Sequence, residues 1–303
     1  MIAIVARFLS ASGQGMRGFA TLCVTVCMLS ALSGCAWWDT KERELVYRPT
    51  PGRPADFKGL RPGDEMYFVN VPGVIAGTQD KLQMWWMPQA DPNAPTLLYL
   101  HGTFRTLFRN YPKIEALRDA GFAVLAVDYR GWGESAPIVP SEKTILADAD
   151  TAWGELVRHQ PDPRKRVIFG HSMGGGVAID LASRKHYLSD YAALITESTF
   201  TNLPDVAASV GVLGTVASWI TRQKFDSVDK IGLVDAPILM MHGQDDNTVP
   251  VELGRKLRDA ARPGVRWLEV PGGSHSGLHE EAPELYRQAV KSVINQLPKT
   301  EPP

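Results

Sequence analysis

Residues 166–176 read Arg-Val-Ile-Phe-Gly-His-Ser-Met-Gly-Gly-Gly, and this stretch decides the fold. The apolar run at 167–169 predicts a short buried strand, and the Val, Ala, Ile and Leu pattern over 177–184 predicts a helix. Ser172 then lies at the apex of a tight turn, where the flanking glycines leave room for a strained backbone. A serine in this position is typical of a catalytic nucleophile, because the first N–H groups of the following helix can stabilise an oxyanion. A glycine-rich turn without chemistry is the alternative.

Composition indicates an ordinary globular protein. The chain has 303 residues, of which 44% are hydrophobic, and its formal net charge is −1. These values fit one large domain, and they give no indication of a nucleic-acid partner. The three cysteines, Cys23, Cys27 and Cys35, all lie near the N-terminus. We therefore expect no disulfide, no cysteine nucleophile and no cysteine-based zinc site in the main domain. A serine nucleophile requires no metal or other cofactor, so none is expected.

The first 34 residues are expected to be a signal peptide. Arg7 and Arg17 precede an apolar run over 19–32, interrupted only by Thr and Ser. This run is too short to cross a bilayer comfortably and is typical of the hydrophobic region of a secretory signal. Translation can start at Met1 or at Met16. An N-terminal anchor helix that is never cleaved is the alternative.

The apolar run ends in Leu-Ser-Gly-Cys at 32–35, which resembles the lipobox of bacterial lipoproteins. The resemblance implies cleavage before Cys35 and lipidation of that cysteine, which would anchor the chain to a membrane of the cell envelope. Ala36 after the cysteine implies the outer membrane, with the chain facing the periplasm. The four prolines that follow predict that residues 35–63 form a tether without regular structure.

Residues 64–298 alternate between strand-like and helix-like patterns, which predicts an α/β fold with a mostly parallel sheet of eight strands and helices on both faces. The connection at about 200–236 is expected to form a small helical cap. The predicted strands are 65–71, 81–87, 96–100, 123–127, 167–169, 192–196, 238–241 and 265–270, and the predicted helices are 112–120, 142–158, 177–184, 252–260 and 280–294.

His275 is the predicted general base. It lies in Gly-Gly-Ser-His-Ser at 272–276, a loop of small residues after the last predicted strand. A loop allows an imidazole to lie over the serine, which a position inside a helix or strand does not. His279, at the expected start of the last helix, is the alternative.

Four further segments resemble the Bem46/ABHD13-type α/β-hydrolases. They read Leu-Tyr-Leu-His-Gly at 98–102, Asp-Tyr-Arg-Gly-Trp-Gly-Glu-Ser at 128–135, Pro-Ser-Glu-Lys at 140–143 and Glu-Ser-Thr-Phe-Thr at 197–201. The resemblance covers about residues 97–275 and implies the α/β-hydrolase fold with a serine, acid and histidine in that order. It leaves the substrate open, because members act on esters, thioesters and lipids.

The resemblance also implies the acid. The family pattern His-Gly-x-x-Asp-x-x-Val-Pro, placed on His-Gly-Gln-Asp-Asp-Asn-Thr-Val-Pro at 242–250, selects Asp246. Asp245 is the alternative within this segment. Glu197, at the end of the sixth strand, is a third candidate, because some hydrolases place their acid there.

Two main-chain N–H groups are implied as the oxyanion hole. One belongs to Met173, the residue after the serine, and the other to Thr103, which follows His-Gly at 101–102. His101 itself is expected to be a structural hydrogen-bonding residue. The chain departs from the family's usual His-Gly-Asn-Ala-Gly-Asn by reading His-Gly-Thr-Phe-Arg-Thr at 101–106.

These residues together predict a serine hydrolase that cleaves carboxylic esters through an acyl-enzyme, with a small-molecule or lipid ester as substrate. A serine peptidase or amidase on the same fold and a non-catalytic binding protein of the envelope are the alternatives. Arg105 and Arg109 follow Thr103 in the sequence. They are expected either to bind an anionic group of the substrate or to pair with surface carboxylates.

Overall fold

The computed structural model describes residues 37–211, 214, 218 and 221–298. The predicted signal peptide and Cys35 lie outside these residues.

Residues 37–47 are helical, so the expectation that residues 35–63 lack regular structure is wrong for this part. Ion pairs at helical spacing, Lys41 with Glu44 and Arg43 with Asp39, stabilise the segment, and the prolines begin only after it ends. Among the described residues, no helix is both long enough and apolar enough to cross a bilayer.

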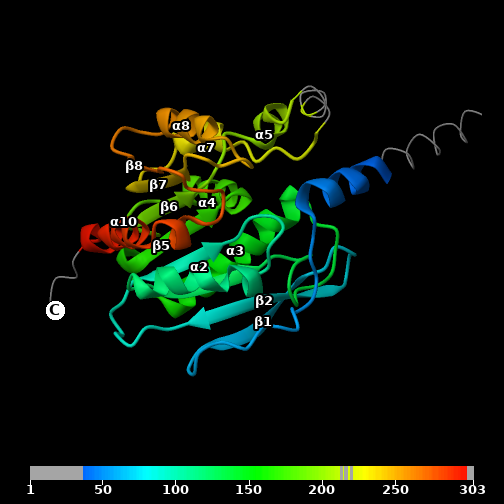
Figure 1. Ribbon diagram of the computed structural model, residues 1–303. Coiled ribbons are helices and arrows are strands. Elements are labelled where there is room, and N and C mark those ends of the chain that lie inside the picture. The colour runs from blue at the N-terminus through cyan, green and yellow to red at the C-terminus, as the bar shows by residue number, and fades with distance from the viewer. Residues whose placement is uncertain (1–36, 212–213, 215–217, 219–220, 299–303) are drawn as a thin grey trace, which may run out of the picture. The chain divides into compact units, whose positions relative to one another are not determined.

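From Val46 onward the chain forms one compact unit, which contains an eight-stranded sheet. The strand order is β1-β2-β4-β3-β5-β6-β7-β8 (Figure 1). The pairs β1–β2 and β2–β4 are antiparallel and all the others are parallel, which confirms the predicted fold. The strands are β1 (Glu65–Pro72), β2 (Gln79–Met87), β3 (Thr96–Leu100), β4 (Ala123–Asp128), β5 (Arg166–His171), β6 (Ala193–Glu197), β7 (Ile238–Gly243) and β8 (Arg266–Val270).

The central strands are buried on both faces, because helices cover the sheet on each side. Alternate residues of β3 point to opposite cores: Leu97 and Tyr99 to one, Leu98 and Leu100 to the other. The first core includes residues of α2 and α10, and the second includes residues of α3, α4 and α8. The bounds of these helices are α2 (Leu107–Asp119), α3 (Glu142–His159), α4 (Met173–Ser183), α8 (Val251–Ala260) and α10 (Pro283–Gln296).

Helix α2 begins five residues before the predicted start at Pro112, which therefore lies inside the helix. Two features explain the longer helix. Leu107 and Phe108 are buried in the core, and the N–H of Leu107 donates to Asp128 Oδ1 at 2.9 Å. Asp128 ends β4, so the carboxylate fixes the start of α2 at the carboxyl end of the sheet. A proline pattern read along the sequence does not reveal this tertiary contact.

The connection between β6 and β7, where the cap is expected, contains α5 (Leu203–Ser209) and α7 (Ser227–Ile231). Asn202 caps α5, because its side chain accepts from the Asp205 N–H at 2.7 Å. Several apolar residues of this connection, at 213, 216, 219 and 220, lie outside the described residues.

Candidate active site

Ser172 connects β5 directly to α4 in a strained turn. Its backbone has φ 56° and ψ −123°, a region that non-glycine residues rarely occupy. The neighbouring chain segments approach so closely that a Cβ on Gly170 would lie 2.1 Å from Gly174 O, and a Cβ on Gly174 would lie 2.0 Å from Leu100 O. Only glycine fits at these two positions. The packing therefore holds Ser172 in a conformation that presents its side chain at the edge of the sheet.

His275 lies between Ser172 and Asp246. Its Nε2 is 2.9 Å from Ser172 Oγ, and its Nδ1 is 2.7 Å from Asp246 Oδ2. With its proton on Nδ1, the ring donates to the carboxylate and accepts from the serine hydroxyl. The three side chains come from the ends of β5 and β7 and from the loop after β8. The structure thus brings together the predicted nucleophile, acid and base.

Asp246 is buried and held by several donors. Its Oδ1 accepts from the N–H groups of Thr248 and Val249, both at 2.8 Å, and His242 Nε2 lies 3.3 Å from its Oδ2. Burial alone would raise the pKa of Asp246, but the nearby His242 ring and the hydrogen bond from His275 dominate and hold the pKa well below its usual range. The carboxylate is therefore ionised at neutral pH.

The alternative acids do not reach His275. Asp245 is exposed and contacts the side chain of Asn247 only through its main-chain oxygen, at 3.1 Å. Glu197 is fully buried, forms an ion pair with Lys113 and accepts from the Tyr286 hydroxyl at 3.0 Å. Glu197 therefore belongs to a structural network below the sheet edge.

The alternative base, His279, is also placed elsewhere. It lies in α9 (Leu278–Glu281), and its Nε2 is 3.7 Å from Glu280 Oε1. Burial, together with the positive charges of Lys113 and Arg105, lowers the pKa of His279 to about 4. His279 is therefore neutral at pH 7 and makes no contact with Ser172 among the interactions of the described residues.

The loop that carries His275 is fixed on both sides. Ser274 donates to Glu281 through its main-chain N–H at 2.7 Å and through its hydroxyl at 2.6 Å. On the other side, His171 Nε2 is 2.9 Å from the main-chain oxygen of His275. Burial and the nearby charge of Lys113 lower the pKa of His171, so the ring is neutral and its Nε2–H donates to that oxygen.

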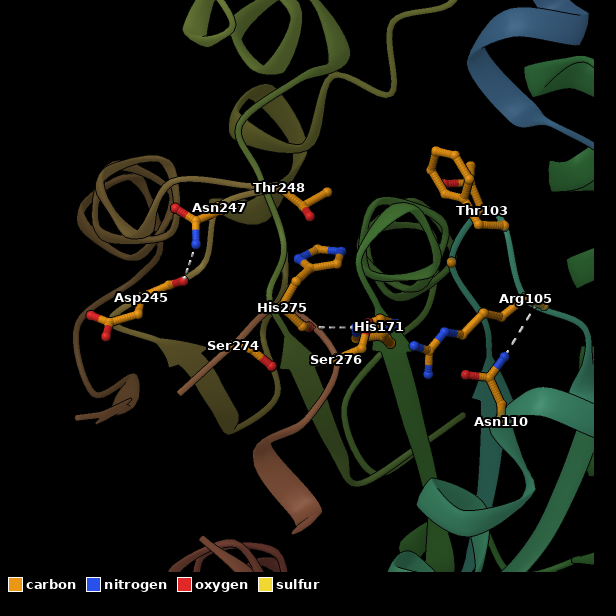
Figure 2. Close-up of a pocket in the computed structure, with 12 residues that line it drawn as sticks. Thr103, Arg105, Asn110, His171, Asp245, Asn247, Thr248, Ser274, His275 and Ser276 are labelled. Atoms are coloured by element: carbon orange, nitrogen blue, oxygen red, sulfur yellow. Dashed lines mark hydrogen bonds between the residues drawn. The ribbon is translucent and has the colours of Figure 1, made fainter. Parts of the chain in front are cut away.

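The expected oxyanion donors lie on either side of Ser172. Met173 is the first residue of α4, so its N–H has no acceptor within the helix. Gly102 packs against the serine, since a Cβ at Gly102 would lie 2.9 Å from Ser172 Cβ. The next residue, Thr103, is half-buried and lines the hollow in front of His275 (Figure 2).

His101 supports this segment from below, as expected for a structural residue. It is fully buried, with Nδ1 2.6 Å from Gly102 O and Nε2 3.3 Å from Asp128 Oδ1. Its ring packs against Tyr129 at 4.6 Å between centroids. Residues 101–106, which include the expected oxyanion donor Thr103, are called the oxyanion segment below. Asp128 therefore contacts both this segment, through His101, and the start of α2.

Comparison with known proteins agrees with this architecture. A family described as serine aminopeptidase, S33, matches residues 91–228. An uncharacterised protein of Mycobacterium tuberculosis is 30% identical over 246 residues, which are 78% of this chain and 81% of that protein. An esterase of Pyrococcus furiosus superposes with a TM-score of 0.64 at 19% identity, over 83% of this chain and 99% of that chain. The chain belongs to the α/β-hydrolase family.

One named relative has an assigned substrate. The lysophosphatidylserine lipase ABHD12 of Rattus norvegicus is 34% identical over 257 residues, which are 75% of this hydrolase and 64% of the relative. These matches establish hydrolase chemistry in the family.

A hollow of about 450 Å³ lies in front of His275 in this hydrolase (Figure 2). It is lined by the oxyanion segment on one side and by Asn247, Thr248 and the His275 loop on the other. This volume accommodates a small acyl or alcohol group. Among the described residues, no three His, Cys, Asp or Glu side chains are grouped so that they could hold a metal ion.

Three residues that support the predicted triad, directly or through the His275 loop, were not predicted from the sequence. They are His171 and Glu281, which fix the His275 loop, and His242, which contacts Asp246. His171 and His242 lie inside the two motifs that select Ser172 and Asp246, so their positions carry a local signal. Glu281 has no such signal, because its contact depends on how α9 folds back on the loop.

Proposed function

We propose that this α/β-hydrolase is a serine hydrolase that cleaves carboxylic esters through an acyl-enzyme intermediate. The observation that carries the proposal is the position of His275, within hydrogen-bond distance of both Ser172 Oγ and Asp246 Oδ2. A buried, ionised Asp246 favours the tautomer with a free Nε2, which is the form that can accept the serine proton.

The geometry supports a two-step acyl transfer. Ser172 Oγ attacks the ester carbonyl carbon while its proton passes to His275 Nε2, and the Met173 and Thr103 N–H groups bind the oxyanion. The intermediate collapses when His275 returns the proton to the leaving alcohol oxygen, which breaks the ester bond. Water then attacks the acyl-enzyme by the same route, giving the carboxylic acid and free Ser172. Asp246 holds the imidazole and stabilises its cationic form throughout.

An ester is favoured over an amide by the named relatives, a lipase and an esterase. The second candidate is a serine peptidase or amidase, because the matching family carries a peptidase description. The two are separated by kcat/KM for p-nitrophenyl butyrate and for the corresponding butyryl p-nitroanilide. The proposal expects turnover of the ester, lost in Ser172→Ala, and little or no turnover of the anilide. Preferential anilide cleavage would support the amidase, and a lack of turnover of both would support a binding protein.

We further propose that the enzyme is a Bem46/ABHD13-type member carried by a lipoprotein signal. The Leu-Ser-Gly-Cys sequence at 32–35 supports this, with Cys35 as the lipidated residue. The enzyme would then act at the periplasmic face of the outer membrane. A lipid anchor there would keep the active site close to lipid esters.

A further inference from the structure

A second hollow, of about 230 Å³, lies beside the one in front of His275. Four residues line both hollows: Arg105, Asn110, Ser274 and Ser276. The two spaces are therefore adjacent and share a wall. A substrate whose ester lies at Ser172 can place another part of its structure in this second space.

Arg105 is the residue at the boundary that has an uncompensated charge. Figure 2 shows its side chain running from the oxyanion segment into the hollow, towards His171. Among the described residues no carboxylate lies within ion-pair distance of its guanidinium, and the side chain is exposed. Arg109, four residues further on and inside α2, differs, because its guanidinium pairs with Asp56 at 3.0 Å. The structure thus separates the two arginines that the sequence could not distinguish.

The backbone that carries Arg105 is fixed. Asn110 Nδ2 donates to the main-chain oxygens of Arg105 at 3.3 Å and Thr106 at 2.9 Å. Asn110 is itself buried in the first turns of α2. The guanidinium is therefore presented by an ordered segment, so that less freedom is lost when it binds a ligand.

The other side chains around the second hollow do not neutralise the charge of Arg105. The Lys113 ammonium is paired with Glu197, and Glu281 accepts the two hydrogen bonds from Ser274. Glu280 is mostly exposed, with 69% of its side chain accessible. His279 makes no hydrogen bond through either ring nitrogen within the described chain.

We propose that Arg105 binds a phosphate or carboxylate group of the ester substrate in the second hollow. This inference rests on the proposed ester hydrolysis at Ser172. The planar guanidinium presents two N–H groups that match two oxygens of such an anion. Ser276, which lines both hollows, adds a hydroxyl that can donate to the same group. The preferred substrates are therefore anionic esters rather than neutral ones of the same shape.

Matched esters test this preference. The probes are 4-(butyryloxy)benzoate and 4-(butyryloxy)benzamide, which differ in one charged group on the leaving side. In wild type the ratio of kcat/KM for the anionic to the neutral ester should exceed that in Arg105→Gln by about tenfold, or about 1.4 kcal/mol. Arg105→Lys, which keeps the charge but loses the planar fork, should give an intermediate ratio. Arg109→Gln is the matched control and should keep the wild-type ratio, because Asp56 already pairs with that guanidinium.

A binding measurement tests the site without catalysis. The folded Ser172→Ala protein is titrated with phenyl phosphate, and the Arg105 Nε–H resonance is followed by ¹⁵N NMR, with benzyl alcohol as the neutral control. Phenyl phosphate should shift the Arg105 Nε–H resonance in a saturable way, and benzyl alcohol should not. The pKa of His279 should also rise when the anion binds nearby. Inorganic phosphate is titrated in parallel, to separate a site for a free anion from one for the substrate.

The two measurements separate the two proposals. Ester turnover with an unchanged ratio in Arg105→Gln would overturn the anion site and leave the serine hydrolase intact. Absence of turnover with saturable phosphate binding at Arg105 would overturn the ester proposal and also the assignment of this anion to a substrate. Absence of any saturable movement would overturn the anion site directly.

Discussion

His171 Nε2 lies 2.9 Å from the main-chain oxygen of His275, so the residue before Ser172 holds the loop of the proposed base. His171 is buried at the end of β5. The contact therefore fixes the His275 loop, which has little regular structure, relative to the strained turn at Ser172. We treat His171 as a positioning residue for His275.

His171→Leu should lower kcat by about tenfold to 10²-fold with little change in KM, because a small displacement of the base misaligns proton transfer. His171→Gln should recover much of the loss, because its amide can donate to the same oxygen. The measurement is steady-state kinetics on p-nitrophenyl butyrate, with circular dichroism to show that both variants fold. Equal kcat in folded His171→Leu and wild type would exclude the positioning role.

The assignment of the acid predicts a sharp contrast between neighbours. Asp246→Asn should lower kcat by up to about 10⁴-fold, since the amide no longer favours the required His275 tautomer. Asp245→Asn is the matched control and should retain activity within about twofold, because its carboxylate is exposed and away from His275. The opposite ranking would show that the acid has been assigned one residue too late.

The pKa of His279 predicts how stability depends on pH. Its pKa is about 4 in the folded chain and about 6.5 when unfolded, so between these values the unfolded state binds more protons. Stability should therefore fall as the pH falls below about 6.5, and this residue accounts for about 2 kcal/mol between pH 7 and pH 5. Glu281, whose pKa is lowered by hydrogen bonds from Ser274, affects the pH dependence of stability mainly below this pH interval.

Urea unfolding of wild type and His279→Gln at pH 7 and pH 5 isolates this effect. Between pH 7 and pH 5 the free energy of unfolding of His279→Gln should fall by about 2 kcal/mol less than that of wild type. An identical loss in the two proteins would show that His279 titrates normally in the folded chain.

The proposed lipoprotein signal predicts attachment at a single cysteine. When the full chain is expressed in a bacterial host with labelled palmitate, the protein should incorporate label and sediment with membranes. Cys35→Ser should do neither, whereas Cys27→Ser, inside the expected signal peptide, should behave as wild type. Label that persists in Cys35→Ser would contradict the lipobox assignment.

The sequence predicted the sheet and the order of the candidate residues well, because these depend on local signals. The apolar run of β5, the glycines around Ser172 and the position of His275 after the last strand are all local patterns. The start of α2 and the contact of His171 were missed, because each joins segments far apart in the chain. The contact of Glu281 was missed because it depends on how α9 folds back on the His275 loop. The distinction between Arg105 and Arg109 also required the structure, since it depends on the position of Asp56.

Covalent labelling tests whether Ser172 is a nucleophile activated by His275. A fluorophosphonate probe should modify the wild-type enzyme once, and mass spectrometry of the digested protein should locate the adduct on Ser172. Folded Ser172→Ala should not react, and His275→Ala should react far more slowly, because the serine then lacks its base. An adduct on another residue, or undiminished labelling of folded Ser172→Ala, would contradict the account.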